Sequence, residues 1–223
     1  MLKAVIFDMD GVIIDSESIY LELERKLFKD LGLEISEEEH DSFVGTKADY
    51  MWTKIKEKYR LEPSVEELVA MEYRLYFDHI ASLGDLSPIP GVKELIESLH
   101  QKGVRLALAS SNYMNVIEMV LDIFKLQKYF DVITSGEQVE NGKPAPDIFL
   151  AALKQLGVKA EECLVIEDSE NGVKAAKTAG IKCVGFKGMN LRNQDLSLAD
   201  LVVSSFYEID YGTLRELCST QAG

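Results

Sequence analysis

The chain has 223 residues, 47% of them hydrophobic, which is enough for one substantial core and a smaller helical unit. Its 24 basic and 38 acidic residues give a formal net charge of −14, which repels nucleic acids and anionic membrane surfaces, so we expect neither as a partner. The sequence shows no signal-peptide or membrane-spanning pattern, and its cysteines, Cys163, Cys183 and Cys218, lack the spacing of a disulfide framework, so a cytoplasmic location is expected.

Residues 3–7 form the first predicted strand, a short β-rich run that leads directly into Asp8 and Asp10. Gly11 follows, where the backbone could turn sharply beneath the two carboxylates. Two carboxylates this close repel each other unless a cation lies between them, and oxygen ligands suit Mg²⁺. Because acidic residues after a strand also begin ordinary loops, this pair alone does not decide between a metal site and a turn.

The next segment is predicted to contain helices and no strand. Ser36 with Glu39, and Ser64 with Glu67, have the spacing of capping boxes at helix starts. We therefore expect a helical cap subdomain inserted after the first strand. The expected boundaries are 1–15 and 88–223 for the core and 16–87 for the cap.

Strands and helices alternate in the rest of the chain. The further predicted strands are residues 105–109, 132–135, 163–166 and 182–186. One-sided apolar spacing predicts helices from Val92 and from Asp147, and Gly103, Gly157 and Gly180 stand where helices would end. This alternation predicts an α/β fold, with a doubly wound parallel sheet covered by helices on both faces. Ligands of such sheets bind beyond the carboxyl ends of the strands.

Polar side chains follow three more of the predicted strands or the loops between them. Ser110 and Asn112 come after the second strand, Lys143 lies in a proline-rich loop, and Glu167 and Asp168 end the fourth strand. Each has an ordinary alternative, since Ser110 could cap a helix, Lys143 could be solvated, and the acidic pair could begin a helix. Because these segments and the Asp8–Asp10 pair all lie at or near strand ends, a single shared site is favoured over four unrelated local roles.

The segments together resemble the haloacid dehalogenase superfamily, in the branch that contains β-phosphoglucomutase and sugar-phosphate phosphatases. The matching segments are Asp8-Met9-Asp10-Gly11, Ser110, Lys143-Pro144, and Glu167-Asp168-Ser169 with Asn171-Gly172 and Ala175-Ala176. The resemblance covers essentially the whole chain and implies a Rossmann-like core with a helical cap. A monomer is the expected state for this architecture.

By this resemblance, Asp8 is the nucleophile that forms an aspartyl-phosphate and Asp10 is the general acid and base. The same resemblance implies a Mg²⁺ ion held by Asp8, the backbone carbonyl of Asp10, and Asp168. Glu167 would be a further ligand or a group behind the ligands.

Phosphate binding is assigned, again by resemblance, to Ser110 and Lys143, with Asn112 assisting. The implied activity is magnesium-dependent hydrolysis of a small phosphorylated metabolite, with a sugar phosphate as the favoured class. The alternatives are β-phosphoglucomutase activity and a non-catalytic protein that binds a metabolite or a partner.

One position in the predicted cap favours hydrolysis over mutase chemistry. β-Phosphoglucomutases carry a histidine on the first cap helix, and Tyr20 stands at that spacing here. The three histidines, His40, His79 and His100, do not match the position and are expected to be packed or solvated. The loop Gly45-Thr46-Lys47 is either a substrate loop or an ordinary charged loop tip.

Overall fold

The computed structural model describes all residues except 44–45, 83–85, 189–193 and 221–223. Within the described residues, six parallel strands form one sheet in the order β3-β2-β1-β4-β5-β6. The strands are β1 (Ala4–Phe7), β2 (Arg105–Ser110), β3 (Val132–Ser135), β4 (Cys163–Glu167), β5 (Lys182–Phe186) and β6 (Leu201–Val203). The predicted α/β fold with a doubly wound parallel sheet is confirmed.

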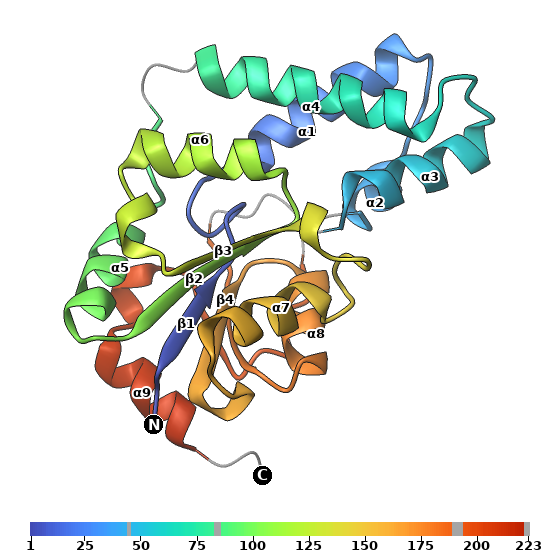
Figure 1. The fold of residues 1–223 in the computed structure, drawn as a ribbon. Helices are drawn as coiled ribbons and strands as arrows, with labels where there is room; N and C mark the ends of the chain where they lie inside the picture. The colour runs from blue at the N-terminus through green and yellow to red at the C-terminus, as the bar shows by residue number, and fades with distance from the viewer. Residues whose placement is uncertain (44–45, 83–85, 189–193, 221–223) are drawn as a thin grey trace.

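Helices cover both faces of the sheet (Figure 1). The first face carries α5 (Val92–Gln101), α6 (Met114–Phe124) and α9 (Tyr211–Ser219), and the opposite face carries α7 (Asp147–Leu156) and α8 (Glu170–Thr178). Short 3₁₀ turns lie at Gln127–Tyr129, Gly136–Gln138, Ala160–Glu162 and Phe206–Glu208. The strands between these two layers are almost fully buried, as expected for a parallel sheet.

Among the described residues, four helices that follow β1 in the chain lie beyond one end of the sheet (Figure 1). They are α1 (Glu17–Asp30), α2 (Glu37–Asp41), α3 (Ala48–Tyr59) and α4 (Val65–Ser82). Trp52, Ile55 and Leu68 are central to an apolar core of their own. We call this layer the cap, and its predicted boundaries at residues 16 and 87 stay a prediction.

Helices α2 and α4 of the cap begin as their capping residues predict. The Ser36 hydroxyl accepts a hydrogen bond from the Glu39 amide at 3.2 Å. Ser64 and Glu67 exchange both bonds of a capping box, at 3.2 Å to the Ser64 hydroxyl and 2.8 Å from the Ser64 amide. Each bond satisfies an amide that the first turn of a helix leaves without a partner, so local sequence sets where these helices start.

The prediction of the sheet was incomplete at its edge. Strand β6 was missed because it has three residues, with Val202 exposed at the edge, and therefore offers no recognisable pattern. Two predicted strands were also one residue too short, since Ser110 and Glu167 are the last residues of β2 and β4. Both residues are fully buried, which places their side chains within the sheet edge and not in a loop after it.

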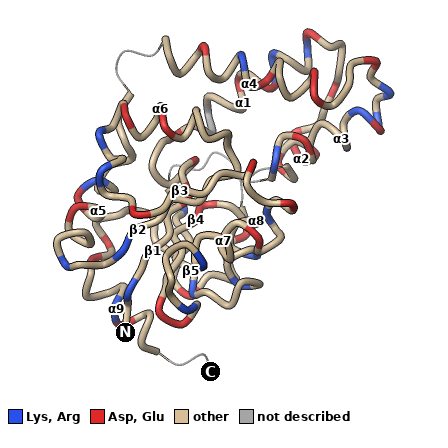
Figure 2. The backbone as a smooth tube through the Cα atoms, in the orientation of Figure 1, with Lys and Arg blue, Asp and Glu red and all other residues tan. Residues whose placement is uncertain are grey.

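Charge is distributed over both layers, with Asp and Glu recurring along the cap and the sheet domain (Figure 2). Among the residues that the structure describes, no helix is both long and apolar enough to cross a bilayer.

Candidate active site

Two carboxylates are adjacent because β1 and β4 are paired. Phe7 stands opposite Ile166 in the parallel register, so the next residues, Asp8 and Glu167, follow side by side at the carboxyl ends of the two strands. Together with Asp168 they offer carboxylate oxygens that lie within 4.8 Å of one another. All three side chains are buried. The sheet therefore brings together the acidic groups that the sequence placed 160 residues apart.

Two glycines make the room that these carboxylates occupy. Gly11 has a φ of +70°, and a Cβ there would lie 2.0 Å from Oδ2 of Asp168. A Cβ on Gly172 would lie 1.8 Å from Oε1 of Glu167. The backbone thus approaches each carboxylate as closely as a residue without a side chain allows, which explains the two glycines physically.

Lys143 lies between the carboxylates of β1 and β4. Its ammonium donates to Oδ1 of Asp8 at 2.7 Å and also to Oε1 of Glu167, and its side chain is 1% exposed. Burial raises the pKa of Asp8 to about 8, against the opposing effect of Lys143. Burial alone would lower the pKa of Lys143, but Asp8 and Glu167 reverse this and raise it, so the lysine stays charged.

Glu167 also fixes the chain that follows it. Its Oε2 accepts the backbone amides of Asp168 at 2.9 Å and Ser169 at 3.0 Å, and the Ser169 hydroxyl at 3.1 Å. Ser169 in turn caps α8 by accepting the Gly172 amide at 3.0 Å. Glu167 therefore orients both Asp168 and Lys143, and its service as a metal ligand stays a prediction.

Asp10 lies in a separate hydrogen-bonding environment. Its carboxylate accepts bonds from the Ser16 hydroxyl at 2.5 Å, the Asn112 amide at 3.2 Å and the Ser110 hydroxyl at 3.4 Å. Burial raises the pKa of Asp10, and the bonds from Ser16 and Asn112 oppose this. The two aspartates are therefore held differently, Asp8 by a charged lysine and Asp10 by neutral donors, as two different chemical roles would require.

Asn112 links Asp10 to the cap. Its side-chain amide also donates to the Tyr20 hydroxyl at 2.6 Å. Tyr20 lies on α1 and stacks on Tyr76 of α4, with ring centroids 4.0 Å apart. Tyr20, which stands where mutases have their histidine, thus belongs to the site, and its hydroxyl contacts the partner of Asp10.

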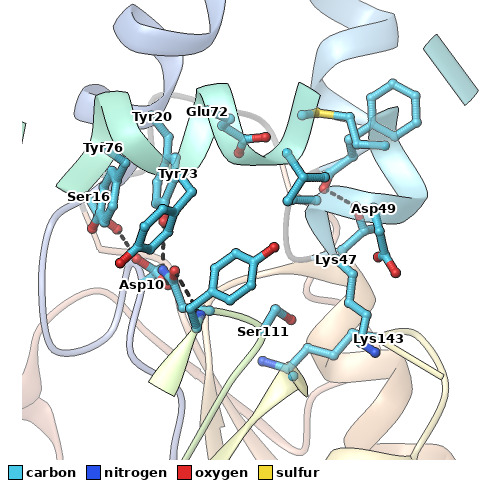
Figure 3. A pocket seen from close by; sticks show the side chains of 18 of the residues that line it. Asp10, Ser16, Tyr20, Lys47, Asp49, Glu72, Tyr73, Tyr76, Ser111 and Lys143 are labelled. Atoms are coloured by element: carbon cyan, nitrogen blue, oxygen red, sulfur yellow. Dashed lines mark hydrogen bonds between the residues drawn. The ribbon is translucent and has the colours of Figure 1, made fainter. Parts of the chain in front are cut away.

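A cavity of about 400 Å³ extends from these residues into the cap (Figure 3). Its floor includes Asp8, Asp10, Lys143 and Asp168, and Asn112 and Ser111 also line it. Of the predicted phosphate-binding residues, Asn112 and Lys143 line the cavity beside the two aspartates, which suits a tetrahedral anion. Ser110 is fully buried and bonds Asp10, and its neighbour Ser111 lines the cavity.

The cap side of the cavity contains residues that the sequence did not identify as site residues. Glu24, His40 and Glu72 line it, and so do Thr46 and Lys47 of the expected substrate loop. The first residue of that loop, Gly45, lies outside the described residues. His40 was expected to be packed or solvated, and it is buried and packs against Phe28. Its position in the cavity wall was not predicted, because no sequence spacing connects it with Asp8 or Lys143.

Residues 5–186 match the family of haloacid dehalogenase-like hydrolases. The chain belongs to this family. It is 38% identical to the phosphorylated carbohydrates phosphatase of Thermotoga maritima over 184 residues, which cover 81% of this chain and 83% of that protein. It is 32% identical to hexitol phosphatase B of Escherichia coli strain K12 over 214 residues, with 93% and 94% of the two chains covered.

A solved structure gives the same fold. The β-phosphoglucomutase of Clostridium difficile superposes with a TM-score of 0.86 at 28% identity, over 98% of this chain and 97% of that one. The predicted family and its branch are confirmed, because phosphatases and a mutase both occur among the similar proteins.

The buried carboxylates fit the Mg²⁺ ion that the family implies. Asp8, Glu167 and Asp168 provide only oxygen ligands, the donor type that Mg²⁺ prefers. The raised pKa of Asp8 reflects a buried carboxylate that one lysine does not fully compensate. A divalent cation beside Asp8 and Asp168 would remove this imbalance.

Proposed function

We propose that this protein is a magnesium-dependent phosphatase of small phosphorylated carbohydrates that works through an aspartyl-phosphate on Asp8. The enzyme class, a phosphoric monoester hydrolase, rests on the family and on relatives named as phosphatases. The observation that carries the mechanism is the pairing of Asp8 with buried Lys143 beside Asp168, at the floor of a cavity large enough for a small metabolite.

In the first half of the proposed reaction, an oxygen of Asp8 forms a bond to phosphorus while the bond from phosphorus to the ester oxygen breaks. Asp10 gives its proton to that leaving oxygen, and the raised pKa of Asp10 favours the protonated form that this step needs. Ser110, Asn112 and Lys143 stabilise the phosphoryl oxygens. When bound, Mg²⁺ would neutralise charge on those oxygens, held by Asp8, Asp168 and the Asp10 carbonyl, with Glu167 as ligand or supporting group.

In the second half, a water attacks the phosphorus of the aspartyl-phosphate. Asp10 takes a proton from this water, the bond from phosphorus to the Asp8 oxygen breaks, and inorganic phosphate leaves. Asp8 and Asp10 return to their starting states, so one water is consumed for each ester cleaved. Splitting one displacement into two steps is the usual benefit of a covalent intermediate.

The test is a screen for phosphate release from sugar and polyol phosphates with Mg²⁺, run on the wild type and Asp8→Asn together. Asn keeps the size of Asp8 but removes the nucleophilic oxygen charge, so we expect a loss of about 10³-fold or more in kcat. Both proteins should unfold cooperatively in a thermal melt. Equal phosphate release by the two proteins would rule out Asp8 as the nucleophile.

A β-phosphoglucomutase is the second candidate, favoured by the solved mutase structure of the same fold. It is separated by supplying β-glucose 1-phosphate with a catalytic trace of glucose 1,6-bisphosphate. Faster formation of glucose 6-phosphate than of free phosphate would favour the mutase. A non-catalytic binding protein predicts no steady phosphate release from any ester in the screen.

A further inference from the structure

Three titratable side chains from different helices meet at the cap end of the cavity. Glu24 comes from α1, His40 from α2 and Glu72 from α4, and all three line the same cavity as Asp8 and Asp10. Figure 3 shows Glu72 pointing from α4 toward the cavity, on the side away from Asp10 and Lys143. We call Glu24, His40 and Glu72 the cap triad.

His40 and Glu72 of the cap triad are buried among apolar side chains, and the side chain of Glu24 is 12% exposed. His40 is 3% exposed and Glu72 is 9% exposed, and Trp52 and Val69 of the surrounding apolar core are as buried. Burying a carboxylate costs several kcal/mol unless hydrogen bonds compensate it, and an apolar side chain at the same place avoids that cost. The cap does not need these acids to pack, which points to a role toward a ligand.

Each carboxylate of the cap triad has one oxygen committed and one available. Oε2 of Glu24 is hydrogen-bonded to His40, and Oε2 of Glu72 accepts the indole N–H of Trp52. Within the described part of the chain, Oε1 of either glutamate accepts no hydrogen bond. Among the described residues, the Tyr76 hydroxyl is the one fully buried side-chain oxygen or nitrogen without a hydrogen-bond partner. The Oε1 atoms of Glu24 and Glu72 are not of this kind, so they are accessible from the cavity. The available oxygens can therefore accept bonds from a molecule in the cavity.

The Tyr76 hydroxyl is a second, independent sign of a polar ligand. Tyr76 is 2% exposed and lines the cavity, yet its hydroxyl has no hydrogen-bond partner among the described residues. A buried polar group without a partner is unfavourable, so a ligand atom that pairs with it would contribute binding energy. The Tyr76 hydroxyl lies near Tyr20, Ser16 and Asp10, whereas the available oxygens of Glu24 and Glu72 lie at the cap end. Hydroxyl groups, which both donate and accept, suit both places.

The positive charges that line the cavity are directed elsewhere. Among the described residues these are Lys143, whose ammonium bonds Asp8 and Glu167, and Lys47, whose ammonium donates to the Val139 carbonyl of the sheet domain at 2.7 Å. His40 is bonded to Glu24. A second phosphate at the cap end would thus meet the acidic side chains Glu24 and Glu72 and, among the described residues, no uncommitted ammonium. Anions pay a large cost for leaving water under those conditions.

We infer that Glu24 and Glu72 bind the hydroxyl groups of the substrate at the end farthest from its phosphate, so that the enzyme selects monophosphates of polyols and sugars and rejects those with a second anionic group at that end. This inference rests on the proposed phosphatase function and names the part of the substrate that the cap would recognise.

The first experiment compares three esters of equal length that differ only at the carbon farthest from phosphate. They are glucitol 6-phosphate with a hydroxymethyl group, gluconate 6-phosphate with a carboxylate, and 1-amino-1-deoxyglucitol 6-phosphate with an ammonium group. We expect kcat/KM to be about tenfold or more higher for the hydroxymethyl ester than for the carboxylate ester, mainly through KM. Equal rates, or a preference for the ammonium ester of roughly tenfold, would overturn the inference.

The second experiment changes the two glutamates. Glu72→Leu and Glu24→Leu remove the acceptors, and each should lower kcat/KM for glucitol 6-phosphate by about tenfold. Glycerol 3-phosphate is too short to reach from the floor into the cap and should be affected less than about twofold. Glu66→Gln on α4 and Glu22→Gln on α1 are matched controls, because both side chains are exposed and neither lines the cavity.

The two experiments separate the inference from the function on which it rests. Phosphate release from glycerol 3-phosphate by the wild type but not by Asp8→Asn supports the function whatever the cap does. If that difference holds while Glu72→Leu and Glu24→Leu lose equal activity on the short and long esters, the inference is wrong and the phosphatase stands. A thermal melt of each variant identifies loss through misfolding, and Glu72→Met and Glu24→Met then repeat the comparison with similar side-chain length and no acceptor oxygen.

Discussion

Acidic side chains lie at both ends of the cavity. Asp8 and Glu167 on the sheet are buried, and in the cap Glu72 is buried and Glu24 is partly buried. On the sheet they are held by the Lys143 ammonium and by backbone amides. In the cap, among the described residues, His40 bonds Glu24 and Trp52 bonds Glu72, one side chain for each acid. At the floor, Lys143 and backbone amides therefore offset the negative charge of the carboxylates before any ligand binds. In the cap, one oxygen of each glutamate is left available to a ligand.

This difference separates chemistry from recognition. A reacting centre needs its groups held in one geometry before substrate arrives, because misplacement by about 1 Å can cost a factor of 100 in rate. A recognition surface gains from groups that are completed by the ligand. The floor and the cap of this cavity fit these two descriptions, and the following experiments test that division.

The largest effect is expected where the backbone itself shapes the floor. Gly11→Ala should reduce kcat by about 100-fold or more, because the new Cβ would collide with Asp168 at 2.0 Å and displace it. Gly32→Ala is the matched control, since Gly32 has a φ of +71° and nothing lies within 4 Å of its Cβ position. Both variants should lose about 1 kcal/mol of stability from the left-handed backbone, measured by urea unfolding. Retained activity in Gly11→Ala would show that the position of Asp168 is not critical.

The next largest effect tests the charge balance of the floor. Lys143→Met should lower the free energy of unfolding by about 3–5 kcal/mol without Mg²⁺, because it leaves Asp8 and Glu167 buried without a cation. Added Mg²⁺ should restore part of this stability, whereas kcat stays low because the phosphoryl oxygens lose a donor.

Lys174→Met is the comparison for that variant. Lys174 is 44% exposed and pairs with Glu170 one helical turn away, so its loss should change the free energy of unfolding by about 0.5 kcal/mol or less. Similar losses in the two variants would mean that burial does not distinguish the floor pair from a surface pair.

A smaller effect addresses the charge balance of the cap. Burial, with a further contribution from Glu24, raises the pKa of Glu72 from 4.5 to about 8. The folded state then keeps a proton that the unfolded chain releases, so the free energy of unfolding should fall as pH rises from about 4.5 to 8, by up to about 1.4 kcal/mol per pH unit. In Glu72→Gln this contribution is absent. Urea unfolding of the wild type and Glu72→Gln at pH 5, 6, 7 and 8 measures how the free energy of unfolding of each depends on pH. The same pH dependence in both proteins would mean that the pKa of Glu72 is in its ordinary range.

The smallest effect concerns the contact between the two ends. Lys47 of the cap donates to the Val139 carbonyl at 2.7 Å, and a Cβ on Gly142 would lie 2.5 Å from Cγ of Lys47. Lys47→Met and Gly142→Ala should each lower kcat/KM by roughly threefold to tenfold, because each weakens the closed contact of cap and sheet domain. Steady-state kinetics on one good substrate measures this, and the combined variant should be less than additive because both changes affect one contact. Full additivity would show that the two residues act separately.

The sequence by itself determined the parallel sheet, five of its strands to within a residue at each end, and several helix starts and ends. Helix starts at Ser36 and Ser64 and helix ends at Gly103, Gly157 and Gly180 depend on hydrogen bonds and positive φ values within a few residues, so local patterns predict them. Asp8, Lys143 and Asp168 could be recognised because each follows a strand or lies in a motif of characteristic composition. Strand β6 was missed because three residues at a sheet edge carry too little pattern.

Only the tertiary structure decided which of these groups meet. The pairing of β1 with β4 brings Asp8 beside Glu167, and the packing of α1, α2 and α4 brings Glu24, His40 and Glu72 into one wall. These contacts join residues 16 to 159 positions apart, and no local periodicity encodes such distances. Strand pairing and helix packing set them, because burial of the apolar faces fixes which elements lie together and hence which polar side chains share a cavity.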